Sequence, residues 1–414
     1  IMESLKWLGL DWDEGPTVEG PNSPYLQSKR LDLYKKYAQI LIDKGLAYPD
    51  PYTEQQVEEF RKKAEEEKRA FLYREHRPET FDVWDGTKPL RFKIPEVKSY
   101  HWHDVVFGDL SAGPEALDDF IMIKSDGYPT YNFAHIVDDT EMGITLVMRG
   151  QEYVSSTPKF LAVYEALGIT PPTYACLPHV LAPGGQKKLG KRDGAKDVLD
   201  YRKEGYLPEA IVNFLAFLGW NPGGEKEIFT REELIEIFDI SRIQVSGAQM
   251  NLEKLEWMNK EHIKLLPHEE VEKNILEWLP EGMKNSKLVP VIVDRISKWS
   301  DVKTMAEAGE LDLFFKALDY SKEKLIFKNT PAEKINENIK LALTELEKIP
   351  EEDFNLEHIK TTLMSIADTL PSRGELLHPV RYALSGLDKS PDPFLIASIL
   401  GKNESISRLQ KATS

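Results

Sequence analysis

The sequence is almost free of cysteine, because Cys176 is the only one among 414 residues. A single thiol cannot form an internal disulfide, and it makes a structural zinc site built from thiolates implausible. Both absences suit a reducing compartment, and we therefore expect the protein to be cytoplasmic.

Long hydrophobic runs are also missing. The longest nearly apolar stretch, from Ala210 to Trp220, contains Asn213 and is shorter than the roughly 20 residues that a membrane-spanning helix needs. The amino end carries no basic segment followed by an apolar one, so secretion is not signalled. The chain begins at Ile1, without methionine and inside an expected helix over residues 2–8, and we expect further residues upstream of it.

An excess of positive charge is absent as well, since the formal net charge is −16. Such a charge argues against indiscriminate coating of nucleic acid but leaves room for a local basic site. Hydrophobic residues make up 41% and charged residues 29% of the chain, the balance of a soluble globular protein. At about 150 residues per domain, the length predicts roughly two to three domains. The part beyond residue 195 has the pattern of successive amphipathic helices.

The first part of the chain mixes helices and short strands. The apolar spacing predicts a helix over 28–44, and oppositely charged pairs four residues apart predict an exposed helix over 54–69. Short strands between turns are expected over 90–94, 100–107 and 120–124.

Two histidines, His101 and His103, alternate along the second of these strands and could be imagined as metal ligands. Alternation along a strand explains them more simply, because no thiol lies nearby. We therefore predict no metal at this position.

A strand–loop–helix–strand unit follows. The apolar run 144–148 is consistent with a buried parallel strand, and a second apolar run lies at 174–181. Between them, Thr157 can cap a helix with Pro158 at its first position, and Gly168 ends it. In such a unit ligands bind at the carboxyl end of the strand, so the loop after residue 148 is the expected ligand side.

The sharpest local signal is a basic loop over residues 186–195, in which glycines flank a cluster of cations. The cations are Lys187, Lys188, Lys191 and Arg192. Clustered cations between glycines suit a polyanion such as a nucleotide phosphate, whereas the alternative is an ordinary solvated basic turn. The G-x-x-x-x-G-K-S/T pattern of a Walker A loop is absent.

Arg149 stands where the first strand of the unit ends. Its guanidinium is either the partner of a structural carboxylate, for which Asp138 and Asp139 are available, or a clamp for a substrate carboxylate. Tyr131, in Ser125-Asp-Gly-Tyr-Pro-Thr-Tyr131, would usually be a packed aromatic residue with a satisfied hydroxyl.

Taken together, these segments and several others resemble the glutamyl-tRNA synthetases, in order and spacing along the whole chain. The matching segments are Leu5–Pro16, Pro24–Arg30, Lys124–Asn132, Val137–Asp139, Arg149, Ser156–Pro158, Lys188–Arg192, Gly205–Ala210, His378–Gly386 and Leu400–Lys402.

The resemblance implies an α/β Rossmann-like catalytic domain of class I, incomplete at its amino terminus, with an α+β insertion. All-α stem-contact and anticodon-binding domains follow. In this chain the catalytic domain would comprise residues 1–47 and 126–199, and the acceptor-binding insertion 48–125. The stem-contact domain would comprise 200–285 and the anticodon-binding domain 286–414.

For ATP, the resemblance places residues 188–192 at the family's KMSKS-type loop, which implies that Lys188 and Lys191 are catalytic and bind ATP. Gly190 stands where serine is usual, which removes a hydroxyl and loosens the loop. Leu181 and Glu152 fall on positions near the bound nucleotide. Magnesium is expected to accompany ATP.

For the other substrates, Tyr131 and Arg149 fall on the family's glutamate-binding positions. Arg295 falls where the family places a residue near the anticodon, although a surface arginine on an amphipathic helix is the alternative. No cysteine stands in residues 48–80, where some family members bind zinc, so no zinc is expected.

The largest departure is at the front, where the family's first strand, its His-Ile-Gly-His-type ATP motif and its Glu-Asp-Thr-Asp segment have no counterpart. The expected function is ATP-dependent ligation of L-glutamate to tRNA(Glu) through glutamyl-adenylate by a monomer without membrane association. We expect the chain as given to be an inactive fragment of that enzyme. A non-catalytic tRNA-binding paralogue and a helical interaction scaffold are the alternatives, and charging of tRNA(Gln) is left open.

Overall fold

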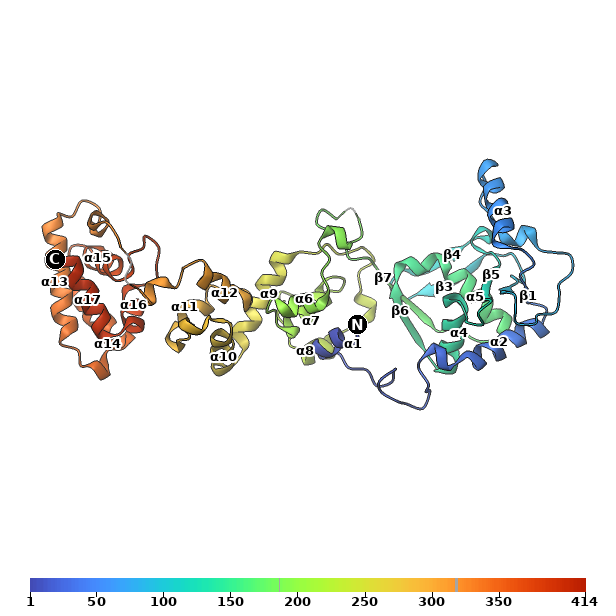
Figure 1. Cartoon of the computed structure of the whole chain (residues 1–414), viewed down its shortest axis with the longest axis horizontal. Helices are drawn as coiled ribbons and strands as arrows, with labels where there is room; N and C mark the ends of the chain where they lie inside the picture. Colours follow the sequence, from blue (N-terminus) through green and yellow to red (C-terminus); the bar gives the residue numbers. More distant parts are fainter. Residues whose placement is uncertain (186, 317–318) are drawn as a thin grey trace. The chain divides into compact units, whose positions relative to one another are not determined.

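The structure, a computed structural model, describes residues 1–185, 187–316 and 319–414 (Figure 1). The chain divides into two compact units. The first unit comprises residues 1–197 and 211–252, and the second comprises 198–210 and 253–414.

The first unit contains a three-stranded antiparallel sheet in the order β1-β2-β5. Its strands are β1 (Ala47–Pro49), β2 (Leu90–Phe92) and β5 (Phe120–Ile123). The predicted strands at 90–94 and 120–124 are confirmed, whereas β1 was missed because three residues are too few for an alternating pattern.

A second, four-stranded sheet has the order β4-β3-β7-β6. Its strands are β3 (Tyr100–Asp104), β4 (Gly108–Ala112), β6 (Leu146–Gly150) and β7 (Thr173–Leu177). Strands β3 and β4 form an antiparallel hairpin, while β7 pairs in parallel with both β3 and β6. The predicted parallel strand–helix–strand unit is therefore confirmed.

The prediction that residues 144–148 form a buried strand is wrong in one respect. Leu146 and Met148 are 39% and 47% exposed, and only Arg149 is buried in β6. Leu146 and Met148 alternate with Val147, which packs against the core, so they share the opposite, exposed face of the sheet. Apolar composition indicated a strand but could not indicate which neighbours cover it.

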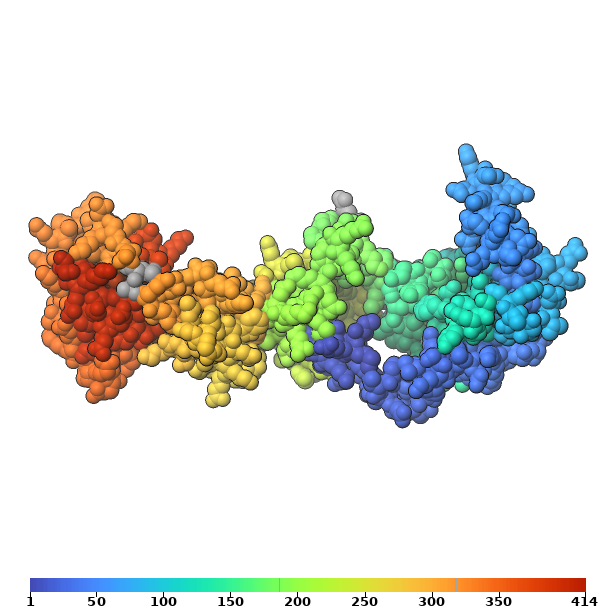
Figure 2. Space-filling view, in the orientation of Figure 1, coloured from blue at the N-terminus to red at the C-terminus, as the bar shows by residue number. Residues whose placement is uncertain are grey.

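Three helices of the first unit, α2 (Leu31–Asp43), α4 (Tyr131–Glu141) and α5 (Thr157–Leu167), pack against the strands in one core cluster. The other helices of this unit are α1 (Met2–Trp7), α3 (Glu54–Glu66) and α8 (Arg231–Ile237). Helix α5 ends at Gly168, whose φ of 77° is readily adopted only by glycine, as the sequence predicted. Helix α3 projects from the first unit in the space-filling view (Figure 2), in agreement with the predicted exposed helix.

The second unit is helical in its described part. Its helices are α6 (Val198–Lys203), α9 (Leu252–Leu265), α10 (His268–Trp278), α11 (Val289–Val293), α12 (Ser300–Glu307), α13 (Ala332–Glu347), α14 (Leu356–Ala367), α15 (Gly374–Ser385), α16 (Pro393–Leu400) and α17 (Lys402–Thr413). Helix α7 (Pro208–Phe217) contains residues of both units. The predicted run of amphipathic helices is confirmed, and their apolar faces form two clusters of buried side chains. In the described part of the chain, no helix combines the length and apolarity needed to span a bilayer.

Candidate active site

Arg149 is a buried guanidinium with two unused hydrogen-bond donors. It lies near the end of β6, opposite Cys176 of β7, and is 9% exposed. Its Nη2 donates to Thr157 Oγ1 at 3.0 Å, while its Nε and Nη1 are buried and have no hydrogen-bond partner in the described structure. Unsatisfied buried donors on a charged group are costly, which favours a ligand that accepts from them.

Aromatic rings surround this guanidinium. Its central carbon lies 5.3 Å from the ring centroid of Tyr153, 5.0 Å from that of Phe160 and 4.9 Å from that of Tyr174. The Tyr174 hydroxyl is also buried without a partner. Rings stabilise the cation through their faces but cannot accept its in-plane hydrogen bonds, so the fork stays open.

The carboxylates suggested as structural partners of Arg149 do not fill that role. Asp138 accepts from Arg30 Nε at 2.8 Å and from the Tyr34 hydroxyl at 2.8 Å. Asp139 accepts from the Tyr164 hydroxyl at 3.5 Å, and no ion pair joins it to Arg149 within the described residues. The interpretation of Arg149 as one half of a structural ion pair therefore has no support in this geometry.

Tyr131, the first residue of α4, lies beside the same cluster and is 48% exposed. Its ring stacks on His135 with centroids 4.8 Å apart, and it lies 5.4 Å from the Tyr153 ring. Burial and the neighbouring Tyr153 raise the pKa of Tyr131, whereas Arg149 opposes the shift. Tyr131 and Arg149 are thus brought together, as the sequence predicted.

His135 was not foreseen from the sequence. Its Nδ1 lies 2.7 Å from the Tyr131 carbonyl oxygen, and because a carbonyl only accepts, Nδ1 carries the hydrogen. The other nitrogen, Nε2, is then an acceptor, and it is buried without a partner. Burial lowers the pKa of His135 to about 4, so the ring is neutral at pH 7. Its spacing of four residues from Tyr131 on one helix was the available signal.

Asp139 lies near Arg149 and is a carboxylic acid whose pKa is raised. Burial, followed by the neighbouring Asp138 carboxylate, raises the pKa of Asp139 from 3.8 to about 6. Because the pKa of Asp139 is raised in the folded state, its contribution to the free energy of unfolding is fully present below pH 3.8. That contribution is lost as the pH rises through about 6.

We expect Asp139→Asn to raise the melting temperature of the first unit at pH 7.5 by roughly 2–4 °C, because it removes a buried charge. The gain should vanish below about pH 4, where the native acid is protonated. Calorimetry across this range checks the prediction, with Asp138→Asn as the control, since it breaks the ion pair with Arg30 and should destabilise at neutral pH. A gain independent of pH would contradict it.

The basic loop begins from a short ladder of backbone contacts. Leu181 bridges Lys188, and the Leu189 amide donates to the Val180 carbonyl at 2.8 Å. The ladder brings the predicted nucleotide positions Leu181 and Lys188 side by side. Gln186, the first residue of the loop, lies outside the described residues.

Glu152, in the 3-10 helix Gln151–Ser156 after β6, contacts this loop. Its carboxylate lies 3.3 Å from Lys188 Nζ and 3.7 Å from His179 Nδ1. A backbone hydrogen bond, followed by Lys188, lowers the pKa of Glu152. Glu152 and Lys188 therefore lie in contact, which the sequence did not predict, and His179 was missed because nothing in its local sequence marks it.

Two cations of the loop are engaged in ion pairs and two are not, within the described residues. Lys187 forms an ion pair with Asp193, and Lys188 pairs with Glu152. Lys191 and Arg192 are exposed and have no ion pair among the described residues. Gly190 has φ −124°, an extended backbone that other residues adopt equally well, so the missing serine leaves the local backbone unstrained.

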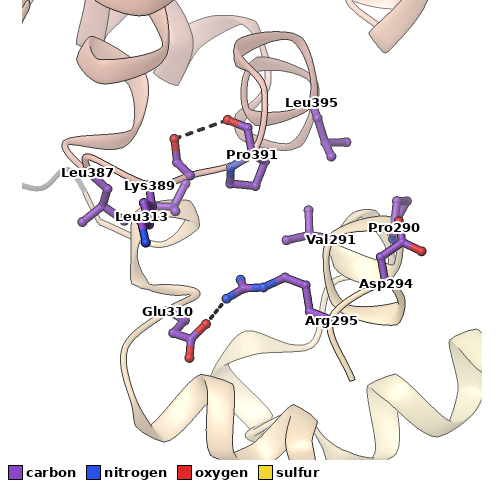
Figure 3. A pocket seen from close by; sticks show the side chains of 11 residues that line it. Pro290, Val291, Asp294, Arg295, Glu310, Leu313, Leu387, Lys389, Pro391 and Leu395 are labelled. Atoms are coloured by element: carbon purple, nitrogen blue, oxygen red, sulfur yellow. Dashed lines mark hydrogen bonds and ion pairs between the residues drawn. The ribbon is translucent and has the colours of Figure 1, made fainter. Parts of the chain in front are cut away.

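Arg295 lies in the second unit, just after α11. It forms an ion pair with Glu310, and both side chains line a cavity of about 570 Å³ (Figure 3). The guanidinium is 43% exposed, so it is neither a core residue nor a freely solvated one.

The two alternating histidines lie on the exposed side of β3, as expected from strand alternation. His103 Nδ1 contacts Asp109 Oδ1 at 2.8 Å across the β3–β4 hairpin. Among the described residues, no group of three or more His, Cys, Asp or Glu side chains is arranged to hold a metal ion.

The sequence of this chain matches two known protein-family models. The family of class I tRNA synthetases (E and Q), through its catalytic domain, matches residues 1–257. The chain belongs to this family. An anticodon-binding domain matches residues 252–413 of the synthetase.

Relatives of the synthetase include the glutamate–tRNA ligases of Clostridium kluyveri and Carboxydothermus hydrogenoformans. They are 40% and 39% identical, and the alignments cover 99% of this chain and 86% and 88% of theirs. The crystal structure of a glutamate tRNA ligase from Elizabethkingia meningosepticum in complex with its amino acid has a TM-score of 0.85 at 30% identity. That match covers 100% of this chain and 88% of the other.

These comparisons confirm the predicted resemblance, the predicted fold class and the prediction of a ligase. The named relatives are ligases, so the alternatives of a non-catalytic paralogue and of an interaction scaffold find no support in them.

Proposed function

We propose that this synthetase ligates L-glutamate to tRNA(Glu) in an ATP-dependent reaction. A carboxylate of glutamate attacks the α-phosphorus of ATP, the bond to pyrophosphate breaks, and glutamyl-adenylate forms. A hydroxyl of the terminal ribose of tRNA then takes the acyl group and releases AMP. Such chemistry depends on positioning and on electrostatic stabilisation rather than on a protein nucleophile.

The observation that carries the proposal is the open fork of Arg149. Nε and Nη1 are unpaired, and each is adjacent to Nη2, which keeps one hydrogen besides the one donated to Thr157. One edge of the planar guanidinium can therefore donate to both oxygens of a carboxylate. Tyr131 is proposed to form a wall of the same pocket through its contacts with His135 and Tyr153. We therefore assign a carboxylate of glutamate to Arg149.

For ATP, we propose that Lys188 and Lys191 neutralise phosphate charge and that Leu181 and Glu152 lie near the nucleotide. The contact between Glu152 and Lys188 supports a shared role for these two residues. Magnesium bound with ATP would supply further neutralisation of the phosphates, as in phosphate sites generally.

Aminoacylation of tRNA(Glu) transcripts tests the proposal directly. In a protein that also carries the family's amino-terminal ATP motif, charging should require ATP and should proceed with glutamate but not with glutamine or aspartate. Charging with glutamine at a comparable rate would contradict the assignment of Arg149, because the side-chain amide of glutamine has one acceptor oxygen and a nitrogen that only donates, so it cannot accept from paired donors at both terminal atoms.

For tRNA, we propose the four-part division stated above, with the acceptor stem at residues 48–125 and the anticodon at 286–414. Arg295 is proposed to contact an anticodon base, because its partly exposed guanidinium faces a cavity large enough for one base. A planar cation can hydrogen-bond the edge of an unstacked base. We also propose a cytoplasmic monomer, which the single buried cysteine suits.

We expect Arg295→Ala to weaken binding of tRNA(Glu) by roughly 1–3 kcal/mol at fixed salt if Arg295 contacts a base. The net charge of −16 makes nonspecific attraction weak, so placed contacts should dominate selectivity. Binding of tRNA(Glu) and of tRNAs with other anticodons measures the effect. Equal weakening for every tRNA would indicate a phosphate contact, and no change would mean an ordinary surface arginine.

A further inference from the structure

Residues 50–77 form an arm that leaves the three-stranded sheet after β1 and returns to it before β2. Its main element is the exposed helix α3, which projects from the first unit (Figure 2). The one buried residue of α3 is Ala64, and Phe60 stacks on His76 of the returning part with ring centroids 4.1 Å apart. Helix α3 thus packs on the arm itself, and the direction of the arm is set where its two ends meet the sheet.

Asp50 holds the outgoing end of the arm. It is 6% exposed, and its amide donates to the Pro89 carbonyl at 2.7 Å. Its carboxylate accepts from Arg91 Nε in β2 at 2.7 Å and from the hydroxyl of Tyr73, which belongs to the returning end. The Arg91 guanidinium also lies 3.4 Å from the centroid of the Tyr73 ring. One carboxylate therefore joins both ends of the arm to β2.

Asp118 and Asp119, just before β5, hold the returning end. Asp119 is 3% exposed and accepts from Arg77 Nε at 2.6 Å and from Arg77 Nη2 at 2.5 Å. It also accepts from the Tyr48 hydroxyl in β1 at 2.8 Å, while Asp118 accepts from the Tyr73 amide at 2.9 Å. The returning end is therefore joined to the two outer strands of the sheet.

Two ion pairs, Arg91 with Asp50 and Arg77 with Asp119, form what we call the base clamp. The side chains of the two acids are 5% and 0% exposed, so both pairs are largely removed from water. A buried pair that loses one partner leaves an uncompensated charge, which is strongly destabilising. The two ends of the arm consequently stay together on the sheet while both pairs are intact.

We propose that the base clamp positions the arm for the acceptor stem of tRNA, with Asp119 and Arg77 as positioning residues. The proposal rests on the assignment of residues 48–125 to the acceptor stem given above. Lys62 and Lys63 of α3 are exposed and have no ion pair in the described part of the chain, so their charges are available to phosphate groups. A docked arm presents these cations at one place, whereas a released arm binds only in the fraction of molecules in which it returns there.

Binding of a minihelix that carries the acceptor stem of tRNA(Glu) tests this at one salt concentration. Arg77→Ala and Asp119→Asn should each weaken binding by about tenfold, if loss of the clamp leaves the arm docked in about a tenth of the molecules. The direction in Asp119→Asn is decisive, because removal of a negative charge would by itself strengthen binding to RNA. Lys44→Ala is the matched control, since it removes a cation of the same unit whose Nζ donates only to the Ala166 carbonyl, and the affinity should stay nearly unchanged.

Hydrogen exchange of the same variants separates release of the arm from loss of the fold. In Arg77→Ala the amides of residues 54–76 should exchange faster, while those of β1, β2 and β5 keep their protection. If Asp119→Asn does not fold, Tyr48→Phe takes its place, because it removes only one hydroxyl from Asp119 and should weaken minihelix binding by a smaller factor.

Three outcomes overturn the inference. The affinity could change in opposite directions in Arg77→Ala and Asp119→Asn, which charge alone would explain. The affinity could stay unchanged although residues 54–76 exchange faster, or exchange could rise throughout the three-stranded sheet, which would make the clamp a support of the fold.

The acceptor-stem assignment fails separately if the unmodified chain does not bind the minihelix, and the inference then fails with it. If the double variant Lys62→Ala with Lys63→Ala weakens binding while the clamp variants do not, the assignment stands and the inference alone is overturned.

Discussion

Replacement of Lys191 by alanine is expected to reduce adenylate formation by about 10²-fold or more, the loss typical of one preorganised donor. Lys187 and Lys188 pair with Asp193 and Glu152, whereas Lys191 has no ion pair in the described structure. Its charge is therefore available to the phosphate from which pyrophosphate departs, where negative charge develops during the reaction.

ATP–pyrophosphate exchange measures this effect in a protein that also carries the family's amino-terminal ATP motif. Lys187→Ala is the matched control, because it removes a cation of the same loop that is already neutralised by Asp193 and should lower the rate much less. If Lys191→Ala weakened tRNA binding while exchange stayed intact, the role assigned to Lys191 would be wrong.

Replacement of Arg149 by lysine is expected to raise the KM for glutamate by about 10²-fold, with a smaller change in kcat. Lysine keeps the charge but loses the planar fork, so its ammonium cannot present two parallel donors to one carboxylate. It would also lose the contact of Nη2 with Thr157. Hydrogen bonds to charged groups are each worth about 1.5–3 kcal/mol, which accounts for the expected magnitude.

Steady-state kinetics with glutamate as the varied substrate checks this prediction. Arg30→Lys is the control, because Arg30 is equally buried but is committed to Asp138. That variant should lower the melting temperature and leave the KM for glutamate unchanged. An unchanged KM in Arg149→Lys would instead assign Arg149 to the support of the fold.

Local signals were sufficient where the cause of an element is local. Pro158 near the start of α5 and a glycine with positive φ at its end are both visible in the sequence. The prediction of Thr157 as a cap is wrong, because Ser156 holds the cap position and Thr157 is the first helical residue. Strand β1 lacked such signals, because three residues pair with β2 more than 40 residues away. Its existence depends on a partner that no local window contains.

The candidate site shows the same division. Tyr131, Arg149, Lys188 and Glu152 were named from the sequence, and the structure brings them together in two pairs. The hydrogen-bond and ion-pair partners of these residues could not be predicted. From the sequence alone, Asp138 was a possible ion-pair partner of Arg149. In the structure Asp138 instead accepts a hydrogen bond from Arg30, which is 108 positions away in the chain.

The sequence by itself determined the family, the parallel strand–helix–strand unit, the run of helices beyond residue 195 and the residue types at the site, because motif spacing and periodicity are properties of neighbouring residues. Only the tertiary structure decided that the Arg149 fork is open, that His135 presents an acceptor and that Glu310 faces the cavity beside Arg295. Whether a buried donor or acceptor is satisfied depends on which distant segments fold against it, and their positions are set by packing rather than by local pattern.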